Sequence, residues 1–221
     1  MTAKELFTAP THVSKHYQVM NEVLSAVTHG IGFFMAVIGL VLLIVKASAT
    51  HDALRITTFT IYGLCLVLLY LFSTLYHSLM FTKARSLFQI FDHSSIFILI
   101  AGSYTPYTLI TIGGWQGWTM FSVNWALAII GILYKIFGKN QRQVFETLLY
   151  IFMGWIVILA AKPMAAALGS QGLWLLISGG IAYTFGALLY SMRRIKYIHV
   201  IWHVFVMIGS VLIFFSIYLY V

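Results

Sequence analysis

The sequence predicts an all-α protein, a seven-helix transmembrane bundle, and two observations support that prediction. Of its 221 residues, 61% are hydrophobic and only 8% are charged, whereas about a quarter of the residues in a soluble domain are charged. The apolar residues are also gathered into long runs, and a helix needs roughly 20 of them to cross a membrane. A water-soluble class is therefore excluded, and we expect one compact domain in contact with membrane lipids.

Seven apolar runs can be marked along the chain, separated by short polar connections. They follow a polar segment over residues 1–21 and cover about 22–45, 55–79, 92–112, 118–136, 144–162, 172–192 and 199–220. Helix-ending residues support these limits, because Gly113 follows the third run, Gly138 the fourth and Pro163 the fifth.

The longest connection, residues 80–91, has a mixed character. Basic Lys83 and Arg85 alternate with large apolar side chains such as Phe81 and Leu87. A segment of this kind is expected to lie in the membrane interface, where apolar side chains enter the lipid and cations stay at headgroup level.

The distribution of Lys and Arg predicts the orientation of the bundle. Ten of the 13 basic residues lie before the first run or at and after the ends of the second, fourth and sixth runs. They are Lys4, Lys15, Lys83, Arg85, Lys135, Lys139, Arg142, Arg193, Arg194 and Lys196. Basic loops stay in the cytoplasm, so we expect a cytoplasmic N-terminus and an external C-terminus. The net charge of +8 is then a topology signal, and no nucleic-acid partner is expected.

Ionisable side chains within apolar runs are costly and point to function. Under this topology, the ionisable side chains within or at the ends of the apolar runs all lie toward the cytoplasmic leaflet. They are Glu22, His29, His77, Asp92, His93, Glu146, His199 and His203. Side chains scattered by chance would fall on both sides, so the sequence predicts one polar layer at the cytoplasmic end.

Three histidines of this layer are candidate metal ligands. His199 and His203 are four residues apart, which puts both imidazoles on one helix face. His77, at the cytoplasmic end of the second run, would add a third nitrogen and leave a fourth position for water, as in catalytic zinc sites. The alternative is that they hydrogen-bond neighbouring helices, and that alternative is favoured for His12 and His16, which share the spacing in the polar N-terminus.

The carboxylates of this polar layer could have either a structural or a chemical role. Asp92, at the expected start of the third helix, could cap free N–H groups or accept a hydrogen bond from metal-bound water and act as a general base. Ser73 lies four residues before His77, on the same helix face. For Glu22 and Glu146, capping or packing is the favoured interpretation.

Three motifs in order resemble the hemolysin III branch of the progestin and adipoQ receptor family, a bacterial branch. They are Ser73-xxx-His77, the block from Phe91-Asp92-His93 to Pro106, and His199-xxx-His203, joined by Thr28-His29-Gly30 near the start. The resemblance implies seven spans, a cytoplasmic N-terminus in the bacterial cytoplasmic membrane and Zn²⁺ on His77, His199 and His203. It also implies that Asp92 contacts zinc-bound water with Ser73 close by.

Two classes of function remain open on this basis. The first is a zinc-dependent intramembrane hydrolase of a lipid amide or ester, with Asp92 acting on the attacking water and Ser73 holding that water or an oxyanion. The second is non-enzymatic: a pore-forming hemolysin, or a sensor of the membrane with zinc as a structural clamp. The spans show no stripe of charged or amide residues of the kind that lines polar channels. The sequence assigns no oligomeric state.

Overall fold

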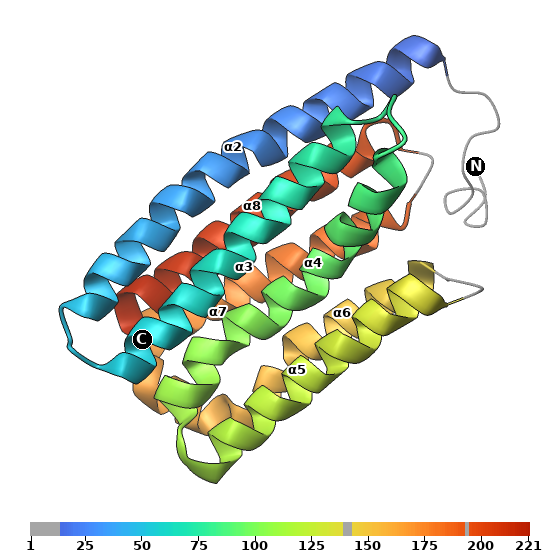
Figure 1. The fold of residues 1–221 in the computed structure, drawn as a ribbon. Helices are drawn as coiled ribbons and strands as arrows, with labels where there is room; N and C mark the ends of the chain where they lie inside the picture. Colours follow the sequence, from blue (N-terminus) through green and yellow to red (C-terminus); the bar gives the residue numbers. More distant parts are fainter. Residues whose placement is uncertain (1–13, 139–142, 193–194) are drawn as a thin grey trace.

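The structure is a computed structural model that describes residues 14–138, 143–192 and 195–221. These residues form helices and contain no strand, as the sequence predicts. The helices run side by side along one axis (Figure 1). In chain order they are α2 (Lys15–Ser48), α3 (Ala53–Ser78), α4 (Arg85–Pro106), η1 (Tyr107–Ile112), α5 (Gly114–Phe137), α6 (Gln143–Trp155), η2 (Ile156–Ala160), α7 (Ala161–Tyr190) and α8 (Ile198–Tyr220).

Six stretches of the described chain are long and apolar enough to cross a membrane. Five of them contain the first four apolar runs and the last run of the sequence. The sixth, Gln143–Tyr190, is 48 residues long and contains both the fifth and the sixth runs. Its helical geometry is interrupted at Gly169, where φ is 63° and ψ is −177°.

Two helix starts differ from the sequence-based limits. Helix α2 begins at Lys15, because Ser14 caps it by accepting a hydrogen bond of 3.2 Å from the backbone N–H of Tyr17. Helix α4 begins at Arg85, so the second half of the expected interfacial connection is already helical. The interpretation of Asp92 as a helix cap is therefore wrong, since Asp92 lies two turns inside α4.

The expectation that Pro163 ends a helix is also wrong. Pro163 lies in the first turn of α7, where the missing N–H costs no helical hydrogen bond and the fixed φ is tolerated. The preceding change from α6 to the 3₁₀ segment η2 is stabilised by Tyr104 of α4. Its hydroxyl donates to the carbonyl of Gly154 at 2.7 Å and accepts from the N–H of Val157 at 2.9 Å, so these backbone groups are satisfied away from water.

Several expectations fall on residues outside the described part of the chain. They concern His12 and the basic residues Lys4, Lys139, Arg142, Arg193 and Arg194. Of the three cations expected on the other side, Lys46 and Arg55 both donate to backbone carbonyls near the end of α8, those of Tyr218 and Val221 respectively. These contacts join α8 to α2 and α3 at the end opposite to His199.

The packing of α3 against α4 depends on a close approach at Gly102. A Cβ atom at this position would lie 2.5 Å from Sγ and 2.8 Å from Cβ of Cys65 on α3. Since Cys65 is buried, neither helix can move away without opening a gap elsewhere in the core.

Replacement of Gly102 by alanine is therefore expected to destabilise the bundle, by about 1–3 kcal/mol for overpacking. Thermal unfolding of the purified protein in detergent measures this change. Gly154→Ala is the matched control, because a Cβ there meets no atom within 4 Å. Equal melting temperatures for the two variants would contradict the close approach of α3 and α4.

Candidate metal centre

His77 of α3 and His199 and His203 of α8 come together at one end of the bundle. One ring nitrogen from each of them lies within 4.8 Å of the others. The Nε2 atoms of His77 and His199 are 3.0 Å apart. The expectation that these three side chains converge from two helices is confirmed, and they are close enough to hold a metal ion.

Helix α2 orients His77 through a carboxylate. Glu22 Oε2 lies 2.7 Å from His77 Nδ1, and its other oxygen accepts a hydrogen bond of 3.0 Å from Arg85. Because a carboxylate only accepts, Nδ1 of His77 carries the proton and Nε2 keeps its lone pair toward His199. Glu22 thus fixes the tautomer that a metal ligand needs.

His203 is oriented by the same helix in the same way. Its Nδ1 donates to the carbonyl of Ser25 at 3.2 Å and lies 3.3 Å from Thr28 Oγ1, whose own proton is directed to backbone carbonyls of α2. His29 stacks on the His203 ring with centroids 3.5 Å apart and planes 9° apart. Nε2 of His203 is therefore the nitrogen left for a ligand.

The stripe Glu22, Ser25 and His29 follows the helical spacing of three and four residues along one face of α2. From the sequence alone, capping or packing is the favoured interpretation for Glu22, and His29 has no assigned role. The available signal was their shared depth with His77 and His203. The sequence does not show that α2 packs against both α3 and α8, and the roles of Glu22 and His29 depend on that packing.

Asp92 and Ser73 are buried near His77 but are not part of the histidine cluster. The carboxyl of Asp92, on α4, lies close enough to Ser73 and His77 of α3 to interact with both. Neither side chain lines the pocket that opens on the histidines. The structure thus places Asp92 and Ser73 close to His77, outside the lining of the pocket.

A second polar cluster joins α4, α5 and α6. Lys135 Nζ donates to both oxygens of Glu146 at 3.1 and 3.3 Å, and His93 Nδ1 lies 3.6 Å from Glu146 Oε2. Lys135 and Glu146 are both buried. Glu146 also lies in the first turn of α6, as the packing or capping interpretation predicts.

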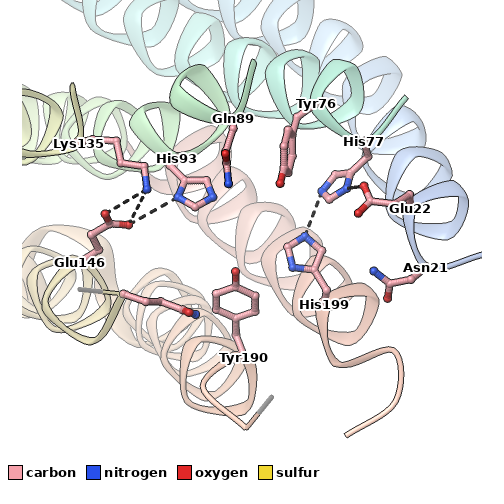
Figure 2. A pocket seen from close by; sticks show the side chains of 11 residues that line it. Asn21, Glu22, Tyr76, His77, Gln89, His93, Lys135, Glu146, Tyr190 and His199 are labelled. Atoms are coloured by element: carbon pink, nitrogen blue, oxygen red, sulfur yellow. Dashed lines mark hydrogen bonds and ion pairs between the residues drawn. The ribbon is translucent and has the colours of Figure 1, made fainter. Parts of the chain in front are cut away.

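A pocket of about 340 Å³ separates the two clusters. Figure 2 shows His77, Glu22 and His199 on one side, Lys135, Glu146 and His93 on the other, and Tyr76, Gln89 and Tyr190 between them. Each of the helices α2 to α8 contributes residues to its lining, and all of these are polar: Asn21, Glu22, Tyr76, His77, Gln89, His93, Lys135, Gln143, Glu146, Tyr190 and His199. Of the three clustered histidines, His77 and His199 line the pocket and His203 does not.

The donor chemistry of the three histidines suits a metal ion, and their ring nitrogens, within 4.8 Å of one another, are close enough to hold one. Tetrahedral coordination at 2.0–2.1 Å places neighbouring ligand nitrogens roughly 3.3 Å apart, close to the 3.0 Å between the Nε2 atoms of His77 and His199. In His77 and His203, the nitrogen that faces away from the cluster is hydrogen-bonded to an acceptor, as is usual for metal-ligating histidines. One side of the cluster opens on the pocket, which leaves room for a further ligand.

Known proteins are similar in sequence to this chain over most of its length. Residues 17–214 match the model of the family described as Haemolysin-III related. The chain is 45% identical to Hemolysin-3 of Bacillus cereus over 203 residues, covering 92% of this chain and 93% of that protein. It is 41% identical to a Hemolysin-3 homolog of Bacillus subtilis over 204 residues, covering 92% and 96% of the two chains.

A more distant similarity extends to animals. The chain is 28% identical to the human Monocyte to macrophage differentiation factor over 199 residues, which are 87% of this chain and 81% of the human protein. This similarity supports the progestin and adipoQ receptor superfamily to which the sequence motifs point. The protein, a multi-pass membrane protein with a histidine cluster able to hold a metal ion, belongs to the hemolysin III family.

Proposed function

We propose that this protein is a zinc-dependent hydrolase that cleaves an amide or ester bond of a membrane lipid. The observation that carries the proposal is the histidine cluster, with two tautomers fixed by α2 and one open side facing a polar pocket. Three nitrogen ligands with an open position are typical of catalytic zinc, whereas structural zinc sites are usually closed by four protein ligands. Zinc held there would supply Lewis acidity that polarises a carbonyl and activates water.

The side chains around the cluster have separate tasks in this proposal. His77, His199 and His203 hold the ion, and Glu22 keeps His77 in its ligating tautomer. Asp92 accepts the proton of the attacking water, because it is the buried carboxylate close to His77. Ser73, next to Asp92, holds that water or the oxyanion that develops on the carbonyl oxygen when the water attacks the carbonyl carbon. As the bond from the carbonyl carbon to the leaving nitrogen or oxygen breaks, Asp92 returns that proton to the leaving amine or alcohol. The acyl group, which now carries the oxygen of the water, leaves as a fatty acid.

A non-enzymatic role is the second candidate, and one observation favours it. The two bacterial relatives reported above bear the name hemolysin. Under this reading the chain permeabilises membranes or senses their state, and the metal ion clamps α3 to α8. The two candidates share the metal site but differ in what the loss of Asp92 would do.

For the arrangement in the membrane we propose seven spans, in the cytoplasmic membrane of a bacterium. The stretch Gln143–Tyr190 would be about 72 Å long as one straight helix, against roughly 30 Å of hydrocarbon. Two crossings with a turn at Gly169, where the backbone adopts a positive φ, account for this length. The N-terminus, residues 1–21, is then cytoplasmic, and the C-terminus is external.

Removal of any one ligand is expected to weaken metal binding strongly. Purified protein should hold about one zinc per chain, and His77→Ala, His199→Ala and His203→Ala should each lose most of it, as elemental analysis would measure. Binding should also weaken at acid pH, because a protonated imidazole cannot ligate. His16→Ala, at an exposed position, is the control. Full zinc occupancy in a His77→Ala, His203→Ala double variant would rule out this site.

Replacement of Asp92 by asparagine separates the two candidate functions. Asn is nearly isosteric, and Asp92 is not among the clustered ligands, so the zinc content and the fold should persist. Hydrolysis of a lipid amide or ester should fall by about 10²- to 10⁴-fold, as expected for the loss of a general base. Retained zinc with unchanged hydrolysis would remove Asp92 from the mechanism. Unchanged lysis by a variant without hydrolysis would instead support the non-enzymatic role.

Reporter fusions test the seven-span topology. A reporter after residue 221 should be external, and reporters near residues 83, 140 and 195 should be cytoplasmic, because the basic loops lie there. The fusions use the activity of an enzyme that works on one side of the membrane only. A cytoplasmic reporter at residue 221 would contradict both the second crossing and the proposed orientation.

A further inference from the structure

A second hollow lies over the connection between α3 and α4, directly beside the pocket. It has a volume of about 560 Å³ and is lined by Tyr76, Thr82, Lys83, Arg85, Ser86 and Gln89. We call it the α3–α4 groove. Tyr76 and Gln89 also line the pocket at the metal centre, so the groove and the pocket share a wall.

The groove has the charge of an anion site. Two of its lining residues are cations, and none is acidic. Arg85 donates to Glu22 at 3.0 Å and lies over the Tyr76 ring, which holds its guanidinium in place. Lys83 is exposed, and no acidic side chain in the described residues forms an ion pair with it.

The segment that carries these cations also presents apolar side chains to the surroundings. Phe81, between α3 and α4, is 74% exposed, and Leu87 and Phe91, in the first two turns of α4, are 50% and 37% exposed. Large exposed apolar side chains next to cations are typical of the depth at which hydrocarbon meets lipid headgroups. The groove is therefore expected to lie at the level of lipid phosphates.

We propose that the α3–α4 groove binds the phosphate of an anionic phospholipid in the surrounding leaflet. The lipid is the occupant, in preference to a free phosphate ion, because Phe81 and Leu87 would contact its acyl chains while Lys83 and Arg85 pair with its phosphate. The binding requires neither a metal ion nor hydrolysis, so it stands apart from the proposed function. Its position is notable, because Arg85, Glu22 and His77 form one hydrogen-bonded series from the groove to the histidine cluster.

The test is native mass spectrometry of the full-length protein, with lipid retention as the readout. The protein is offered phosphatidylglycerol or phosphatidylcholine with the same acyl chains. Lys83 is the residue to change, because it is exposed and, unlike Arg85, does not contact Glu22. We expect preferential retention of phosphatidylglycerol, a loss of about five-fold in Lys83→Gln, the effect of one cation near an anionic surface, and a larger loss in Lys83→Glu.

Lys162→Gln is the matched control, since Lys162 is an exposed lysine at the start of α7 and does not line the groove. It should retain phosphatidylglycerol as the unaltered protein does. Equal retention of both lipids, or equal retention by the Lys83 and Lys162 variants, would overturn the proposal. Displacement of the lipid by an equal concentration of inorganic phosphate would also overturn it, because the groove would then recognise the free ion.

Discussion

Hydrocarbon does not solvate charged or imidazole side chains, so each one that this chain carries into the bundle needs a protein partner. Most of them, in the described residues, are gathered at one end of the bundle, where His29 has a stacked imidazole as its neighbour but no hydrogen-bond partner for its ring nitrogens. Glu22 pairs with His77 and Arg85, and Glu146 pairs with Lys135. A polar pocket then remains between the two groups, in a bundle whose outer surface is apolar. The candidate metal site and the α3–α4 groove both lie at this end, joined by Arg85, Glu22 and His77.

Helix α2 contributes no ligand to the cluster, yet it determines which nitrogen each of two ligands presents. Glu22 and the carbonyl of Ser25 each accept a hydrogen bond from Nδ1–H of a histidine. Loss of the Glu22 carboxylate would leave His77 free to adopt either tautomer, at a cost in affinity typical of outer-shell partners, about 10- to 100-fold. The geometry of the histidine cluster therefore depends on three helices, because α3 and α8 carry the histidines and α2 orients two of them.

Much of this organisation could be predicted from the sequence, because hydropathy and residue spacing are local. The apolar runs and the one-turn spacing of His199 and His203 required no tertiary information. The start of α4 could not be predicted, since the polar turn before Arg85 resembles a longer interfacial loop, and this error made Asp92 look like a cap. The role of His29 and the Lys135–Glu146 pair depend on which helices are neighbours, and no local pattern specifies that.

The central claim is that the polar end of the bundle is a metal centre with three imidazole ligands and an open position. The most direct measurement is the X-ray absorption spectrum of zinc in the purified full-length protein. Three histidine nitrogens at about 2.0–2.1 Å and one further light ligand are expected around the zinc. A spectrum with sulfur ligands, or with an all-oxygen shell and no imidazole scattering, would contradict it.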